Sequence, residues 1–177
     1  MKGTKRDYLA SLESLPGIAY CGYPLEKGVF FLFADDISLK YAYFGCYLRD
    51  TRSVEEHFLQ GEKEPLRRSV DFLDCYFRHQ KAPLPPLDLS PFSEREQAVY
   101  QALLTVPPGE TISYGALAGR AGIPRGARFI GNAMAKNHFP LFIPCHRVIR
   151  SDGALGGYTG GKEIKVFLLK HEKSFTK

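Results

Sequence analysis

The first half of the chain contains an apolar run followed by an alternating segment. Residues 29–34 read VFFLFA, which has the length and composition of a buried strand. Asp35 and Asp36 interrupt this run and predict a turn. Beyond the turn, every second residue is hydrophobic, as in a half-buried strand: Ile37, Leu39, Tyr41 and Tyr43. The pattern predicts an antiparallel hairpin. Its aromatic residues could also stack on bases, but a sheet core is the interpretation we favour.

Helical spacing follows this hairpin. Residues 53–60 predict a short capped helix, and Pro65 suits the first turn of a second helix. The second helix has hydrophobic residues three or four positions apart: Leu66, Val70, Leu73 and Phe77. The segment 83–92 is rich in proline, which lacks an amide donor and stiffens the backbone, and it predicts a linker. We therefore expect an N-terminal α/β domain over residues 1–82 and a C-terminal domain over 93–177.

The C-terminal half is predicted to be mostly helical. Ser93 and Glu96 have the spacing of a capping box at the start of a helix. Four hydrophobic residues then share one face of that helix: Ala98, Val99, Ala102 and Leu103. A last helix is expected over residues 163–172, with four residues facing one way: Ile164, Phe167, Leu168 and His171.

Two short helices are predicted between these. Ser113 can cap a helix over residues 114–120, which stops near Gly122. Pro124 suits the first turn of another helix that runs towards Lys136. Two short helices joined by a turn that contains glycine are typical of a helix-turn-helix.

The charge of the chain is unevenly distributed. The net charge is +5, with 44% hydrophobic and 24% charged residues, as in an ordinary globular protein. Residues 93–177 carry twelve Lys/Arg and six Asp/Glu, whereas residues 1–92 carry twelve and thirteen. The basic half therefore suits a polyanionic partner such as nucleic acid.

The most reactive pair of neighbours in this basic half is Cys145 and His146. A thiol is a poor nucleophile until it loses its proton, and a nearby base can accept that proton. The alternative is that Cys145 is only a small buried hydrophobe, as many free cysteines are. Because neighbours in a strand point to opposite faces, adjacency alone favours that alternative.

Four sequence blocks change this balance. Pro144-Cys145-His146-Arg147 is followed by a Gly-Gly-Tyr-Thr-Gly-Gly block at 156–161 and preceded by blocks at 109–114 and 127–134. Together they resemble the O6-alkylguanine-DNA alkyltransferases, a family of DNA repair proteins, over about residues 90–172. The resemblance implies a ribonuclease H-like N-terminal α/β domain and a mostly helical, winged-helix-like C-terminal domain. It also implies direct, irreversible transfer of the alkyl group from O6-alkylguanine, and less well from O4-alkylthymine, to a cysteine.

The resemblance assigns roles to the reactive residues. Cys145 would accept the alkyl group, His146 would act as general base through a water, and Glu172 would orient the imidazole. From the residues alone, Glu172 could equally be a solvated surface acid. Tyr114 would push the 3′ phosphate while the nucleotide flips, and Arg128 would fill the space that the flipped guanine leaves. An unperturbed cysteine is mostly protonated at neutral pH, so we expect the site to lower the pKa of the thiol.

The resemblance also assigns the DNA contact and the pocket. The helix after Pro124 would enter the minor groove, aided by three small residues: Gly126, Ala127 and Gly131. Five residues would form the guanine pocket: Pro140, Val148, Gly156, Tyr158 and Thr159. Asn137 would link the DNA-contacting helix to the segment with the cysteine. Two residues depart from the family pattern: Phe129 replaces a usual alanine, and Thr159 replaces a common serine.

The same interpretation covers partners and cofactors. Duplex DNA bearing O6-alkylguanine is the expected partner of a single-turnover monomer without an obligate protein partner. No cofactor or metal is expected, because the cysteines and the histidines of the first half lack close ligand spacing: Cys21, Cys46, Cys75, His57 and His79. The absence of a long apolar run or of a leader predicts a cytoplasmic protein, or a nuclear one in a eukaryote. Rival functions are non-catalytic lesion binding, a DNA-binding regulator and a Cys-His hydrolase.

Overall fold

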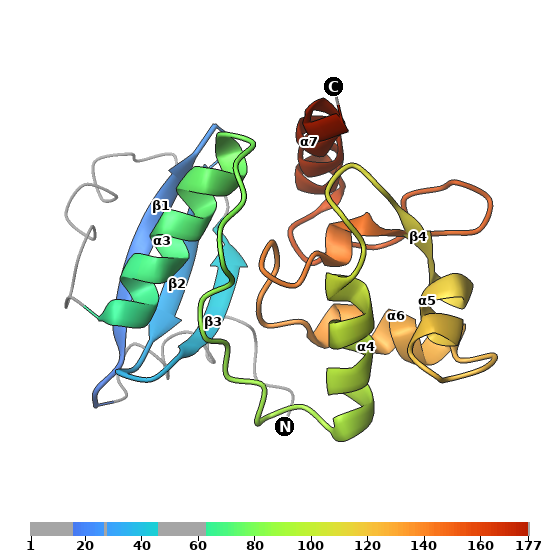
Figure 1. Ribbon diagram of the computed structural model, residues 1–177, viewed down its shortest axis with the longest axis horizontal. Coiled ribbons are helices and arrows are strands. Elements are labelled where there is room, and N and C mark those ends of the chain that lie inside the picture. Colours follow the sequence, from blue (N-terminus) through green and yellow to red (C-terminus); the bar gives the residue numbers. More distant parts are fainter. Residues whose placement is uncertain (1–15, 27, 46–62, 177) are drawn as a thin grey trace. The chain divides into compact units, whose positions relative to one another are not determined.

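The computed structural model describes residues 16–26, 28–45 and 63–176 of the chain (Figure 1). The chain divides into two compact units, residues 1–88 and 89–177. Each unit has its own secondary structure. The helix expected over residues 53–60 lies outside the described residues.

The first unit is built on a three-stranded antiparallel sheet in the order β1 (Ala19–Leu25), β2 (Gly28–Ala34) and β3 (Leu39–Phe44). The predicted hairpin is therefore confirmed as β2 and β3. Ile37 lies in the turn rather than in a strand and is 77% exposed. Its amide donates to Asp35 Oδ1 at 2.8 Å, so the turn extends through the first predicted hydrophobic position of the second strand.

One helix and one extended segment pack on this sheet. Helix α3 (Glu64–Phe77) begins with a proline in its first turn, as predicted, and covers one face of the sheet (Figure 1). Its buried residues share one side: Pro65, Leu66, Ser69, Leu73 and Tyr76. Part of the proline-rich segment pairs with β3, since the Leu39 amide donates to Pro86 O at 2.7 Å. The Asp88 amide donates in turn to Leu39 O at 2.9 Å, which anchors the segment on the sheet.

The second unit contains four α-helices within the described residues. Helix α4 (Glu94–Leu104) begins with the predicted capping box, in which the Ser93 side chain accepts from the Glu96 amide and the Glu96 carboxylate accepts from the Ser93 amide. The buried face differs from the prediction, because Ala98 is exposed and Tyr100 is fully buried. Tyr100 can be buried because its hydroxyl donates to Ala133 O at 2.9 Å.

Helices α5 (Tyr114–Arg120) and α6 (Ala127–Lys136) pack against each other. Ser113 caps α5 as predicted, with its hydroxyl accepting from the Ala116 amide at 3.1 Å. The prediction that α6 starts at Pro124 is wrong. Arg125 has a φ of +57°, a left-handed conformation that no α-helix contains, so α6 starts only after Gly126.

The remaining elements surround the reactive segment. Strands β4 (Ile112–Ser113) and β5 (Val148–Ile149) form a short parallel pair, and the 3₁₀ helix η1 (Cys145–Arg147) leads directly into β5. Helix α7 (Lys162–Glu172) is followed by the 3₁₀ helix η2 (Lys173–Thr176).

The predicted inner face of α7 is largely wrong. Lys165, Leu168 and Glu172 are fully buried, whereas Ile164, Phe167 and His171 are only half-buried. Hydrophobic periodicity missed this face because two of its three buried members are charged.

Candidate active site

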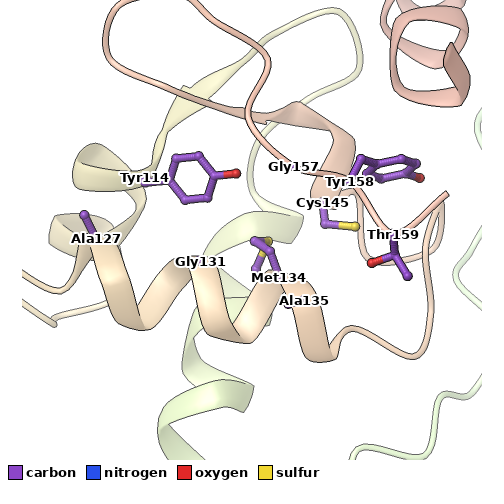
Figure 2. A pocket seen from close by; sticks show the side chains of 9 residues that line it. All are labelled: Tyr114, Ala127, Gly131, Met134, Ala135, Cys145, Gly157, Tyr158 and Thr159. Carbon is purple, nitrogen blue, oxygen red and sulfur yellow. The ribbon is translucent and has the colours of Figure 1, made fainter. Parts of the chain in front are cut away.

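A pocket of about 640 Å³ opens in the second unit (Figure 2). Nine residues line it: Tyr114, Ala127, Gly131, Met134, Ala135, Cys145, Gly157, Tyr158 and Thr159. They come from the start of α5, one face of α6, the start of η1 and the loop before α7. Helical spacing puts Ala127, Gly131 and Ala135 on the same side of α6, and their small side chains leave this wall of the pocket open.

Cys145 lies on this pocket wall with a nearly inaccessible side chain, 4% exposed. Asn137 Nδ2 donates to Cys145 Sγ at 3.1 Å. Burial raises the pKa of the Cys145 thiol to about 11, although the Asn137 hydrogen bond and the charge of Lys165 act in the opposite direction. The expectation of a lowered pKa is therefore wrong. The thiol keeps its proton at neutral pH, and a reaction at sulfur needs a base to remove it.

His146, which follows Cys145 in the chain, forms a buried pair with Glu172. His146 Nε2 lies 2.7 Å from Glu172 Oε1, and neither side chain is exposed. An ionised carboxylate only accepts hydrogen bonds, so Nε2 carries the proton of a neutral imidazole. Burial lowers the pKa of His146 even though Glu172 opposes this effect. The imidazole is therefore neutral near pH 7, with Nδ1 as its acceptor nitrogen.

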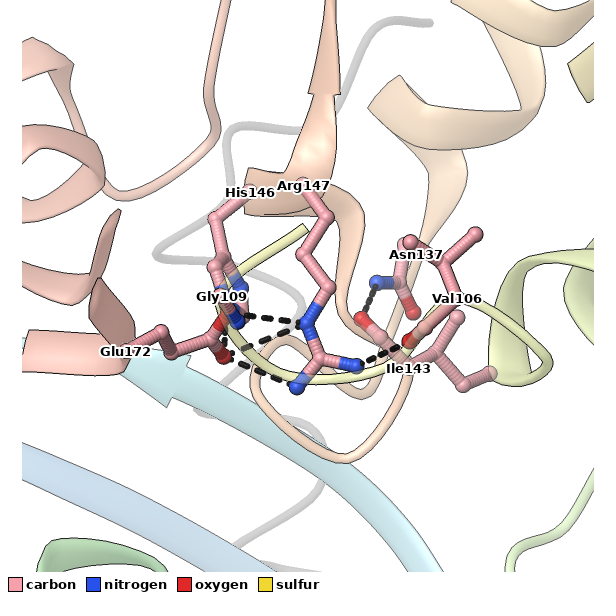
Figure 3. Close-up of polar contacts among 7 residues, drawn as sticks. All are labelled: Val106, Gly109, Asn137, Ile143, His146, Arg147 and Glu172. Atoms are coloured by element: carbon pink, nitrogen blue, oxygen red, sulfur yellow. Dashed lines mark hydrogen bonds and ion pairs between the residues drawn. The ribbon is translucent and has the colours of Figure 1, made fainter. Parts of the chain in front are cut away.

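Arg147 also binds the Glu172 carboxylate (Figure 3). Its Nε donates to Oε2 at 3.0 Å, and its Nη2 donates to Oε1 at 2.8 Å. Nη1 donates to Val106 O at 2.6 Å, and the Gly109 amide donates to Glu172 Oε2 at 3.2 Å. Burial raises the pKa of Glu172, but the hydrogen bonds from His146 and Arg147 and the charge of Arg147 outweigh it and hold the pKa well below its usual range. Glu172 is thus a buried anion and not the solvated acid of the alternative interpretation.

Asn137 connects the end of α6 to the reactive segment. Its Nδ2 donates to Ile143 O at 2.9 Å as well as to the Cys145 sulfur, and its Oδ1 accepts from the Phe139 amide at 2.9 Å. Because Asn137 is 5% exposed, water does not reach its side-chain amide, and these three hydrogen bonds satisfy its polar atoms instead.

Lys165 is a second charged residue that the sequence interpretation missed. It is fully buried on α7, where its ammonium donates to Val148 O at 2.7 Å, to Leu155 O, and to Gly157 O at 3.3 Å. The three bonds tie the strand after the cysteine to the loop that lines the pocket. Burial lowers the pKa of Lys165.

The structure places the predicted pocket residues at different depths. Tyr158 and Thr159 line the pocket, but Pro140, Val148 and Gly156 are not among the lining residues. Gly156 instead backs onto Tyr114: a Cβ added to it would lie 2.8 Å from the Tyr114 hydroxyl oxygen. The Tyr114 side chain, and not empty space, therefore occupies the position next to this glycine.

The outer side of α6 carries exposed polar residues. Arg128 and Asn132 are exposed, and Gly126 lies at the N-terminal end of the helix. Phe129 is half-buried, and the guanidinium of Arg95 from α4 lies 4.9 Å from the centre of its ring. Phe129 thus neither enters the core nor narrows the pocket, but forms a cation–π pair that joins α6 to α4.

The described residues contain no group of three or more His, Cys, Asp or Glu side chains that could hold a metal ion. Cys21, Cys75 and Cys145 are free thiols, while Cys46 and His57 lie outside the described part of the chain. No helix in the described ranges has the length and apolar composition that a membrane span requires.

Comparisons with known proteins agree on one family. Residues 94–174 match the family model for the DNA-binding domain of 6-O-methylguanine DNA methyltransferase. The methylated-DNA–protein-cysteine methyltransferase of Mus musculus is 45% identical over 121 residues, which are 64% of this chain and 57% of the mouse protein. The chain thus spans little more than half the length of that relative.

Other relatives are similar over nearly their whole length. The protein of the same name from Methanosarcina acetivorans is 34% identical over 158 residues, which cover 88% of this chain and 98% of that protein. The crystal structure of Mycobacterium tuberculosis OGT in complex with DNA is similar with a TM-score of 0.72 and 34% identity, over 88% of this chain and 93% of that one.

Proposed function

The chain belongs to the methylated-DNA–protein-cysteine methyltransferase family, and from this premise we propose that it repairs O6-alkylguanine in DNA by transferring the alkyl group to Cys145. The observation that carries the proposal is the position of Cys145 on the wall of a pocket, next in the chain to His146, whose side chain forms a buried pair with Glu172. The mixed α/β fold is that of the family, which agrees with the fold class predicted from the sequence. We further propose that the two units correspond to the two predicted domains.

The proposed reaction is a single displacement at the alkyl carbon. His146 Nδ1 takes the thiol proton through a water molecule, and the sulfur attacks the alkyl carbon. A carbon–sulfur bond forms as the carbon–O6 bond breaks, and its electrons remain on the guanine. The Tyr114 hydroxyl donates a proton to N3 of the guanine, and the proton held by His146 returns to the tyrosinate through water, so that guanine leaves as a neutral base. Since the thioether cannot lose the alkyl group again, each molecule reacts once.

The environment of the thiol supports this order of events. Burial keeps Cys145 protonated and keeps His146 neutral, so the acceptor is ready before the thiolate exists. Glu172 accepts from Nε2 and thereby fixes the tautomer in which Nδ1 can take a proton. This is the nucleophile, base and orienting acid of a hydrolase triad, used for a single turnover.

The shape of the pocket supports a flipped base as the substrate. The alkyl group on O6 is enclosed in the duplex, so the nucleotide must rotate out at a cost of a few kcal/mol. A volume of about 640 Å³ suits a small ligand of this kind. We assign the wall beside Cys145 to Tyr158 and Thr159, and the supporting positions behind the pocket to Pro140, Val148 and Gly156.

The proposed partner is double-stranded DNA. The small residues Ala127 and Gly131 on α6 would let the helix approach a narrow minor groove, and the exposed Arg128 would enter the stack after flipping. We propose that the protein acts as a monomer without a cofactor and associates with the DNA of the cell. Asn137 would keep α6 and Cys145 in register while DNA binds.

Mass spectrometry after mixing with duplex DNA that contains O6-methylguanine tests the proposal. We expect one added methyl group per protein molecule, on the peptide that contains Cys145. Cys145→Ala should bind the lesion without any mass change, and Cys75→Ala, which removes another free thiol, should react normally. Repeated turnover, or a methyl group on another cysteine, would contradict alkyl transfer to Cys145. Lesion binding by the unmutated protein without a mass increase would instead indicate a non-catalytic lesion-binding protein.

A further inference from the structure

Arg147 is a buried cation that the proposed reaction does not use. It follows His146 in the chain and is 7% exposed. Its guanidinium makes two close bonds to the Glu172 carboxylate and one to Val106 O (Figure 3). A guanidinium fork that matches a carboxylate in this way positions it and compensates its charge.

The carboxylate of Glu172 therefore faces two nitrogen groups that could balance its charge. One is Arg147, which is always protonated, and the other is His146, which can become an imidazolium. A buried anion needs one compensating cation. If Arg147 were absent, the carboxylate would favour the protonated imidazole, because that would be the remaining cation within bonding distance among the described residues.

The other described groups around His146 do not balance the charge of the Glu172 carboxylate. Lys165 lies on the same helix as Glu172, but its ammonium donates to the carbonyls of Val148, Leu155 and Gly157. The Tyr158 ring meets the imidazole edge-on at 6.4 Å, and the Cys145 thiol is neutral. The Gly109 amide adds a hydrogen bond to Glu172 but no full charge.

We propose that Arg147 is a positioning residue that takes up the charge of Glu172, so that His146 remains a neutral base for Cys145. The inference rests on the proposed alkyl transfer and adds a requirement to it. An imidazolium cannot accept the thiol proton, so the carboxylate can orient His146 productively only while another cation balances it. The bond from Nη1 to Val106 O also fixes Arg147 against the backbone segment that precedes β4.

The test is the pH dependence of single-turnover methyl transfer, with Arg147→Met as the variant. In the unmutated protein, we expect loss of activity only at low pH, where His146 becomes protonated. In Arg147→Met the inflection should move to higher pH by one unit or more, so that the rate at a pH below both inflections falls by roughly tenfold or more relative to the unmutated protein and recovers as the pH rises. A uniform loss with an unmoved inflection would reduce Arg147 to a structural residue and overturn the proposal.

A double variant provides the matched control. Arg147→Met/Glu172→Gln removes the cation and the anion together and keeps a side-chain oxygen that can accept from His146 Nε2. Its inflection should return to the unmutated position even if the rate is lower. An inflection that stays at the higher pH would mean that the charge of Glu172 is not the cause of the shift, which contradicts the proposal.

A measurement on the unmutated protein keeps the test independent of whether a variant folds. Nitrogen NMR of the His146 ring should show a neutral imidazole with its proton on Nε2 at pH 7. An imidazolium at pH 7 would overturn the assignment to Arg147. Failure of the alkyl transfer itself is distinguished from this outcome, because it would appear as an unmutated protein that gains no methyl group while its His146 is still neutral.

Discussion

Gly156 has a backbone φ of +67°, in the left-handed region, and faces the Tyr114 hydroxyl. Any side chain at position 156 would therefore destabilise the fold in two ways. The first is the unfavourable backbone conformation of an L-residue, and the second is a contact at 2.8 Å with the tyrosine oxygen. The glycine thus keeps Tyr114 in the pocket as well as shaping the loop.

Gly156→Ala should reduce the free energy of unfolding by more than the backbone conformation alone explains. The left-handed conformation costs about 1–2 kcal/mol, and displacement of Tyr114 should add to this and slow methyl transfer. Gly153→Ala is the matched control, because Gly153 also has a positive φ, +82°, but an added Cβ would meet nothing within 4 Å. The measurements are the free energy of unfolding in urea and the rate of methyl transfer for both variants. Equal rates in the two variants would contradict the role of the Tyr114 contact.

The resemblance assigns roles to individual residues, and those roles stay predictions, whereas the charged residues that support them were not predicted. The family resemblance singles out Cys145, His146 and Glu172, and the structure places His146 and Glu172 within hydrogen-bonding distance. Arg147 and Lys165 were overlooked because charged side chains are usually exposed, and burial depends on distant partners. For Lys165, one signal was present: it shares a helical face with Leu168 and Glu172.

Helices α4 and α6 are joined by Glu96, which has two tasks. Its carboxylate completes the capping box with Ser93 and also accepts from Lys136 Nζ of α6 at 2.7 Å. The hydrogen bond from Lys136 and the bonds from Ser93 lower the pKa of Glu96 from its ordinary 4.5 to about 2, against the opposing effect of burial.

The sign of the resulting pH dependence follows from this lowered pKa. The ionised Glu96 should stabilise the fold above about pH 4.5, and this contribution should disappear as the pH falls towards 2. Glu96→Gln should therefore cost about 1 kcal/mol at pH 6, since Lys136 is largely exposed, and almost nothing at pH 2. Thermal unfolding of both proteins across this range provides the measurement. A stability difference that is the same at pH 6 and pH 2 would exclude ionisation as the cause.

Elements with clear periodicity or capping signals were predicted well, and the others were missed. The two strands of the hairpin and helices α3, α4, α5 and α7 form where they were predicted, although the buried faces of α4 and α7 differ from the predicted ones. Strand β1 was missed because Gly22 and Pro24 interrupt it, and both residues usually indicate turns. Pairing with β2 along its whole length holds it in place, and such pairing cannot be seen in a local pattern.

At the scale of the molecule, the candidate chemistry is confined to one unit. The pocket and the network around Glu172 lie within residues 89–177, and the family model covers 94–174 of them. The other unit contains the three-stranded sheet and α3, and none of its described residues lines the pocket. The division matches the uneven charge of the sequence, in which the C-terminal half holds the positive excess.

A protein consumed by one reaction has to avoid wasting its sulfur on ordinary electrophiles before it meets a lesion. Burial raises the pKa of the Cys145 thiol, so little of it is ionised at neutral pH and the unused protein should react slowly with such electrophiles. Iodoacetamide should therefore modify the half-buried Cys75 faster than Cys145 in the folded protein, and both at similar rates in urea. Peptide mass mapping over time would measure the order of labelling. Faster labelling of Cys145 than of Cys75 would show that burial does not protect the Cys145 thiol from electrophiles.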